Sequence, residues 1–156
     1  MDTRNSFTDI EYSLRKQTGK RGEFLKRIDP IIPWEQLVDT VQPYYPSGKR
    51  GRPAKPLEVM IRMYFLQQWF GLSAAGLEDA AYDSYAFRKF IGVNFLEEQV
   101  PDADTLCRFK RLLRKHELDV NINSVADDAL KAAGMKLTAG TVAEPQLRIV
   151  RRRNGR

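Results

Sequence analysis

A run of large apolar side chains at residues 56–70, PLEVMIRMYFLQQWF, constrains the fold more than any other stretch of this sequence. Its apolar residues recur at three- and four-residue spacing and also extend around the cylinder, which predicts a helix buried on nearly all sides. Pro56 suits the first helical position and Gly71 is a natural stop. Because Glu58 and Arg62 interrupt the run, it lacks the roughly 18 consecutive apolar residues of a membrane span.

Other segments with helical periodicity surround this central helix in the sequence. The apolar residues of segment 21–32 recur at helical spacing, and we expect Pro30 to end the helix there. Further helices are expected over residues 33–42, 74–82, 84–91, 103–116 and 118–133. Ser73 is a natural N-cap, and Gly92 and Gly134 are natural helix ends. Met135, with the residues up to Val142, is typical of the start of a small hairpin. The sequence therefore predicts an all-α, multi-helix, helix-turn-helix-like domain with a short hairpin near the C-terminus.

The composition fits one packed domain with a moderate positive charge. A chain of 156 residues with 42% hydrophobic content can bury a core. A single cysteine, Cys107, excludes an internal disulfide and fits a reducing compartment. The N-terminus lacks an apolar stretch of signal-peptide length, so we expect a cytoplasmic protein without a membrane partner. The net charge of +6 fits nucleic acid, an anionic membrane or no specific partner, so its distribution decides more than its total.

Residues 44–55, YYPSGKRGRPAK, concentrate positive charge without any acid. Proline and glycine in this segment predict an exposed loop. Its core, residues 50–53, resembles the AT-hook, in which a flat Arg-Gly-Arg segment lies in the narrow minor groove of A·T-rich DNA. The candidate DNA-binding residues of this loop are Lys49, Arg50, Arg52 and Lys55. A solvated linker that merely carries charge is an equally good interpretation of the composition.

The helix expected over residues 103–116 carries a second group of cations. Leu106, Phe109, Leu112 and Leu113 form its apolar face, and the candidate DNA-binding residues Arg108, Lys110, Arg111, Arg114 and Lys115 fall mostly on the other side. A cationic helix after tight helical turns is typical of helix-turn-helix proteins, whose last helix enters the major groove. An ordinary amphipathic helix with a solvated charged face has the same periodicity.

A series of motifs gives the sequence a family resemblance. The motifs are Phe24-Leu25, Pro33-Trp34, Tyr45-Pro46, Arg50-Gly51-Arg52-Pro53, Pro56-Leu57-Glu58-Val59-Met60, Leu66-Gln67-Gln68-Trp69, Leu77-Glu78-Asp79-Ala80, residues 88–90, Pro101-Asp102-Ala103 and Arg108-Phe109. In this order they resemble the N-terminal region of IS5-family bacterial transposases, over about residues 7–118. The resemblance implies a helical domain that binds double-stranded DNA at the terminal inverted repeats of an insertion element. It also implies a following RNase H-like domain, in which an Asp-Asp-Glu triad holds divalent metal ions such as Mg²⁺.

The sequence departs from this family near its end. Glu144 stands where the family has its first catalytic Asp, and the chain ends at residue 156, before the other two carboxylates of the family. We therefore expect a truncated transposase with a polar arm (1–20), a helical DNA-binding domain (21–134) and a remnant of the catalytic domain with a basic tail (135–156). This chain then has no catalytic residues, metal ligands or cofactor of its own. Glu78 is expected to be a surface charge.

Two other functions remain open at the level of sequence. The first is a protein-interaction module, in which an aromatic surface around Trp34, Trp69 and Phe70 serves a homo-oligomer. Such a module could also inhibit transposition through mixed oligomers with a full-length transposase. The second is an active enzyme, which requires a second polypeptide to contribute the missing carboxylates.

Overall fold

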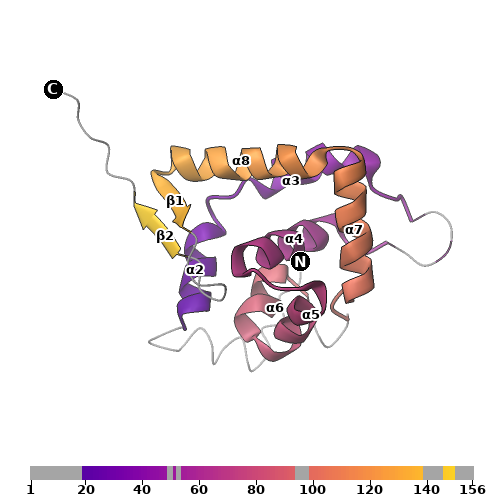
Figure 1. The fold of residues 1–156 in the computed structure, drawn as a ribbon, viewed down its shortest axis with the longest axis horizontal. Coiled ribbons are helices and arrows are strands. Elements are labelled where there is room, and N and C mark those ends of the chain that lie inside the picture. Colours follow the sequence, from indigo (N-terminus) through magenta and orange to yellow (C-terminus); the bar gives the residue numbers. More distant parts are fainter. Residues whose placement is uncertain (1–18, 49–50, 52–53, 94–98, 139–145, 150–156) are drawn as a thin grey trace, which may run out of the picture.

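Helix α4 (Leu57–Phe70) lies at the centre of the fold (Figure 1). The computed structural model describes residues 19–48, 51, 54–93, 99–138 and 146–149. Within α4, Ile61, Met63 and Leu66 are fully buried, and buried residues occur all around the helix. The predicted central helix is thus confirmed. Pro56 is its N-cap residue and not its first helical residue, whereas Gly71 ends it with a left-handed φ of 61° as expected.

The described residues form an all-α domain of seven α-helices, as predicted. Around α4 lie α2 (Lys20–Ile28), α3 (Trp34–Val41), a short 3-10 helix η1 (Gln42–Tyr44), α5 (Ala74–Asp83), α6 (Tyr85–Ile91), α7 (Ala103–Lys115) and α8 (Leu118–Ala132). Ser73 caps α5 through its side chain, as expected, because its Oγ accepts a hydrogen bond from the Gly76 N–H. Gly92 ends α6 and Gly134 follows α8, both with positive φ.

Helix α2 ends just before Pro30, as the sequence predicts. Its last helical residue is Ile28 and Asp29 is its C-cap, although the apolar spacing continues to residue 32. Pro30 has no backbone N–H to continue the helical hydrogen bonds, so the chain turns there. Ile32 is nevertheless only 4% exposed, because the turn returns it to the core.

The other helices surround α4. Helices α3, α5, α6 and α7 all contact α4, and α8 packs against α3 and α7. In Figure 1, α8 and α3 run along the top, α7 descends at the right, and α5 and α6 lie below α4. No helix in the described part of the chain has the length and apolar content needed to cross a membrane.

The predicted hairpin is present after α8. Strands β1 (Met135–Thr138) and β2 (Gln146–Ile149) pair antiparallel, with Met135 opposite Ile149 and Thr138 opposite Gln146. Strand β1 contacts α8, and Met135 and Leu137 pack against the core. The segment expected to turn the hairpin, including Val142, lies outside the described residues, as does most of the polar arm.

The expected aromatic surface is wrong for Phe70, which is 1% exposed. Trp34 and Trp69 are partly buried against the core. The Trp69 ring contacts Phe24 and Phe90 edge-to-face. Much of the aromatic surface of these three residues is therefore used in packing between helices.

Candidate nucleic-acid interface

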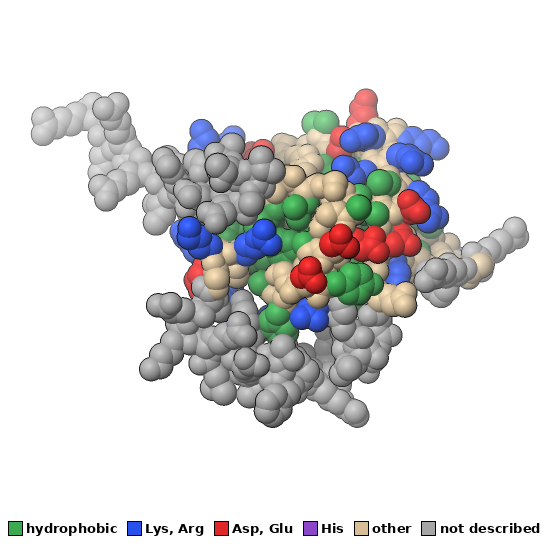
Figure 2. Space-filling model, turned by 60° about the horizontal axis from the view of Figure 1, so that its bottom comes forward, with side chains coloured by type: hydrophobic (Ala, Val, Ile, Leu, Met, Phe, Trp, Pro, Cys, Tyr) green, Lys and Arg blue, Asp and Glu red, His purple; other side chains and the backbone are tan. Residues whose placement is uncertain are grey.

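Helix α7 presents a cationic face to solvent at one edge of the domain. Its apolar residues Leu106, Phe109 and Leu113 are buried. Arg108, Arg111, Arg114 and Lys115 are exposed, and Lys110 is half-buried. Figure 2 shows Lys and Arg side chains gathered at the right-hand side, where α7 lies in Figure 1. The amphipathic pattern of the sequence thus places these cations where an anionic partner can reach them.

The charge of α7 changes sign along the helix. Two acids lie at its start: the N-cap residue Asp102, whose Oδ1 accepts a hydrogen bond from the Thr105 N–H, and the exposed Asp104 in the first turn. The cations begin at Arg108 and continue to the C-terminus. Both groups complement the helix dipole, which favours acids at the N-terminus and cations at the C-terminus. The middle and the C-terminal end of α7 are therefore the part suited to bind phosphates.

A side chain of α5 fixes the start of α7. Glu78 Oε2 accepts a hydrogen bond of 2.9 Å from the backbone N–H of Ala103, the first residue of α7. Glu78 is partly exposed, and this contact with a backbone N–H is a role that the expectation of a surface charge does not include. The contact satisfies a backbone donor that the helix leaves unpaired, and it sets the position of the basic helix relative to α5.

The predicted basic loop begins and ends against α7. The ring centroids of Tyr44 and His116 are 4.6 Å apart. The ring centroids of Tyr45 and Phe109 are 6.0 Å apart, in an edge-to-face arrangement. The Tyr45 hydroxyl donates a hydrogen bond of 2.6 Å to the Lys55 carbonyl. We call Tyr45 and Lys55 the stem. In Figure 1 the chain that follows α3 leaves the domain beside α7.

Lys55 is the candidate loop cation that lies in the described part of the chain. It is half-buried, and its Nζ donates to the Gln99 carbonyl at 3.5 Å, just before the start of α7. Lys49, Arg50 and Arg52 lie outside the described residues, so their DNA contacts stay predictions. The same applies to Glu144. The structure therefore brings Lys55 and the α7 cations to one edge of the domain.

The short helical turns do not lead directly into the basic helix. Residues 71–73 join α4 to α5, and Ser84 joins α5 to α6. Helix α7 follows the longer segment 92–102. The helix-turn-helix assignment consequently stays a prediction, and the position of α7 depends on its packing against α4, α5 and α8.

A partly buried polar cluster lies between α4 and α8. The hydroxyl of the buried Tyr64 accepts hydrogen bonds from Gln68 Nε2 (2.6 Å) and Asn123 Nδ2 (3.0 Å). Burial raises the pKa of Tyr64, and the nearby Asp119 carboxylate adds to this, whereas the two hydrogen bonds and Arg114 act in the opposite direction. The cluster ties α4 to α8 close to Arg114.

Among the described residues no group of three or more His, Cys, Asp or Glu side chains is placed to hold a metal ion. Cys107 is half-buried on α7, and His116 packs against Tyr44 at the end of the same helix. Tyr45 and Glu78 cannot be recognised from the sequence as residues of this site, because both act through backbone atoms of residues far from them in the chain.

Comparison with known proteins adds a family. A family model described as a transposase domain (DUF772) matches residues 12–112, well over half of the chain. The match includes the stem, the central helix and most of α7. No solved structure matches the chain.

Proposed function

Because the chain belongs to the DUF772 transposase-domain family, we propose that it is a DNA-binding domain of an IS5-type transposase. In this proposal it recognises the terminal inverted repeats of an insertion element. The family supports a role in transposition, and the motifs quoted above support the IS5 type. Other parts of a full-length transposase then supply the carboxylates and Mg²⁺ for strand cleavage.

One observation carries the proposal: the stem and the cationic face of α7 occupy the same edge. The Tyr45 ring packs on Phe109 of α7, and the Tyr45 hydroxyl donates to the Lys55 carbonyl. The segment predicted to carry the loop cations therefore begins and ends at a stem that lies against the helix with the exposed Arg108 and Arg111. Clustered cations without intervening acids bind phosphates and release condensed counterions. Two such groups on one edge can contact a single duplex together.

The two groups have different roles in this model. The cations of α7 lie on the major-groove side, where they contact phosphates and base edges. Arg50 and Arg52, in the segment that resembles the AT-hook, contact the minor groove or the backbone. Recognition of the base sequence of the repeat then depends on the α7 side chains. The loop increases the affinity and fixes the position of the domain on the DNA.

The test measures binding to the terminal repeat of a related element against scrambled DNA over a salt series. We expect tighter binding to the repeat and a steep fall of affinity with salt. Arg108→Ala and Arg111→Ala should each lower the salt slope by about one, or cost about 1–3 kcal/mol at the repeat alone if they contact bases.

Lys131→Ala is the matched control, because Lys131 is an exposed cation in the last turn of α8, on a different element. It should leave both slope and affinity unchanged. Equal, weak binding of both DNAs, or equal effects of the α7 variants and the control, would contradict the proposal.

A further inference from the structure

We propose that Tyr45 is a positioning residue that holds Lys55 beside α7, so that Lys55 and the α7 cations bind phosphates of the same DNA duplex. This inference rests on the proposed function. It assigns a role to an uncharged side chain that makes no contact with DNA in this model.

Tyr45, at the start of the loop, contacts both the end of the loop and the basic helix α7. Its ring packs edge-to-face on Phe109, which is 4% exposed and lies between Arg108 and Lys110 in the sequence of α7. Its hydroxyl donates to the Lys55 carbonyl at 2.6 Å. The Tyr45 side chain thus holds the backbone of Lys55, ten residues later in the chain, close to the helix that carries the cations. The Tyr45 hydroxyl is protonated at neutral pH, because the ordinary pKa of tyrosine is already about 10, and burial raises the pKa of Tyr45 further.

Lys55 supplies charge where α7 lacks it. The N-cap Asp102 and the first-turn Asp104 of α7 repel phosphates, and the helix cations begin only at Arg108. Lys55 Nζ lies 3.5 Å from the Gln99 carbonyl, on the segment that leads into this turn. The position of Lys55 therefore extends the cationic edge past the acidic start of the helix. Without the Tyr45 hydroxyl, the Lys55 backbone loses its hydrogen bond, and Lys55 is no longer held at the acidic start of α7.

The test compares Tyr45→Phe with Tyr44→Phe. Each change removes one hydroxyl and keeps a ring that can pack on α7, so both proteins should fold. Tyr44 is the matched control because it contacts His116 through its ring and is 46% exposed. We expect Tyr45→Phe to weaken binding to the repeat roughly three- to tenfold, the effect of one hydrogen bond. Tyr44→Phe should leave affinity within twofold of the parent.

A double-mutant cycle separates positioning from a general loss of stability. Lys55→Gln should lower the salt slope by about one in the parent protein. In the Tyr45→Phe background the same change should have a clearly smaller effect, because Lys55 is already displaced. Additive effects of the two changes would overturn the inference. So would a Tyr45→Phe protein that binds as tightly as Tyr44→Phe.

A measurement without DNA distinguishes this inference from the proposed function. Amide hydrogen exchange over residues 54–60 should quicken in Tyr45→Phe and not in Tyr44→Phe, since the hydroxyl holds this segment. Faster exchange with unchanged DNA affinity would overturn the inference and leave the proposed function standing. A parent protein without salt-dependent DNA binding would overturn both.

Discussion

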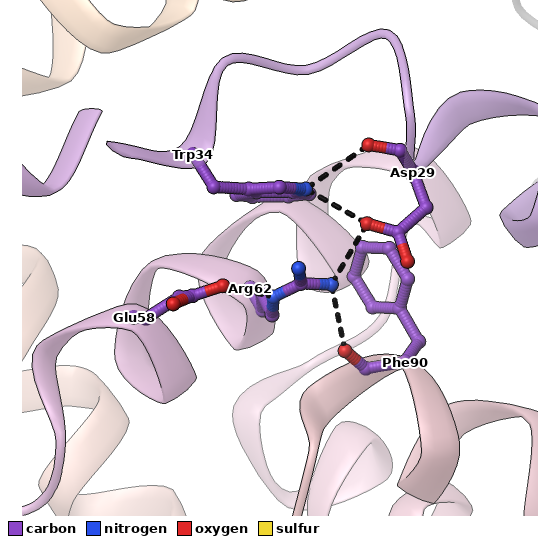
Figure 3. Close-up of polar contacts among 5 residues, drawn as sticks. All are labelled: Asp29, Trp34, Glu58, Arg62 and Phe90. Atoms are coloured by element: carbon purple, nitrogen blue, oxygen red, sulfur yellow. Dashed lines mark hydrogen bonds and ion pairs between the residues drawn. The ribbon is translucent and has the colours of Figure 1, made fainter. Parts of the chain in front are cut away.

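The Arg62 guanidinium packs against the Trp34 indole, with 4.3 Å between its central carbon and the ring centroid (Figure 3). The same group donates to Asp29 Oδ1 at 3.0 Å and to the Phe90 carbonyl at 2.9 Å. Trp34 Nε1 donates to the same Asp29 oxygen at 2.8 Å. Arg62 thereby joins α4 to α6, to the end of α2 and to the start of α3. A single cation connects four segments of the domain.

Arg62→Met should lower the free energy of unfolding by about 2–3 kcal/mol. The Arg62 side chain is 14% exposed, and its loss leaves the 42% exposed Asp29 carboxylate without its ion-pair partner. Solvent at Asp29 keeps the cost below that of a fully buried pair. Urea unfolding measures the change. The control Arg111→Met removes an exposed cation of α7 and should stay within about 0.5 kcal/mol of the parent; equal losses in the two variants would contradict the assignment.

The sequence predicts local features of this fold better than long-range ones. Ser73 and Gly71 are recognisable because a cap or a left-handed residue depends on its immediate neighbours. Arg62 reads in the sequence as an interruption of an apolar helix. Its partner Asp29 is 33 residues away, and nothing in local spacing reveals that pairing. Likewise, the sequence alone does not show that Trp34 and Trp69 pack against the core, because their partners lie on other helices.

Glu78→Ala should destabilise the domain by about 1–2 kcal/mol, since it leaves the Ala103 N–H at the start of α7 without its charged acceptor. The control Asp79→Ala changes an exposed acid of the same helix and should cost little.

Asp102→Ala removes the N-cap of α7 and should cost about 0.5–2 kcal/mol. Because Glu78 and Asp102 both act on one helix end, the double variant should depart from additivity in thermal or urea unfolding. Strict additivity would show that the two contacts are independent.

Asp104→Asn should raise affinity for scrambled DNA at low salt by up to about fivefold, corresponding to roughly 1 kcal/mol of relieved repulsion. Asp104 is an exposed carboxylate in the first turn of the basic helix, where it opposes phosphates of any sequence. The gain should disappear at high salt, because exposed charges are screened. Asp128→Asn on α8 is the control, being an exposed acid on another element. Equal gains from both variants would mean that net charge alone, and not the α7 face, governs binding.

The cations of the candidate interface can be proposed from the sequence, whereas their arrangement in space cannot. Charge clusters at the basic loop and at Arg108 are visible in the sequence, because exposed cations need no partner to be recognised. Their arrangement on one edge depends on Tyr45 and Phe109, two aromatic residues far apart in the chain that any core could bury. The Tyr45 hydrogen bond to a backbone carbonyl leaves no signature in the sequence at all.

The stability of the domain should fall as pH rises above about 10, and two tyrosines cause part of that loss. Burial raises the pKa of both Tyr45 and Tyr64 above the ordinary value of 10.0. Their contribution is complete below that value and is lost as pH passes through the folded pKa, because the unfolded chain then releases the protons more readily. Urea unfolding between pH 8 and about 11 should therefore show a shallower decline for Tyr45→Phe than for the parent, and likewise for Tyr64→Phe. Tyr64→Phe should also be less stable at neutral pH, since Asn123 and Gln68 lose a partner. A decline as steep as the parent's in both variants would show that neither hydroxyl is held in its protonated form by the fold.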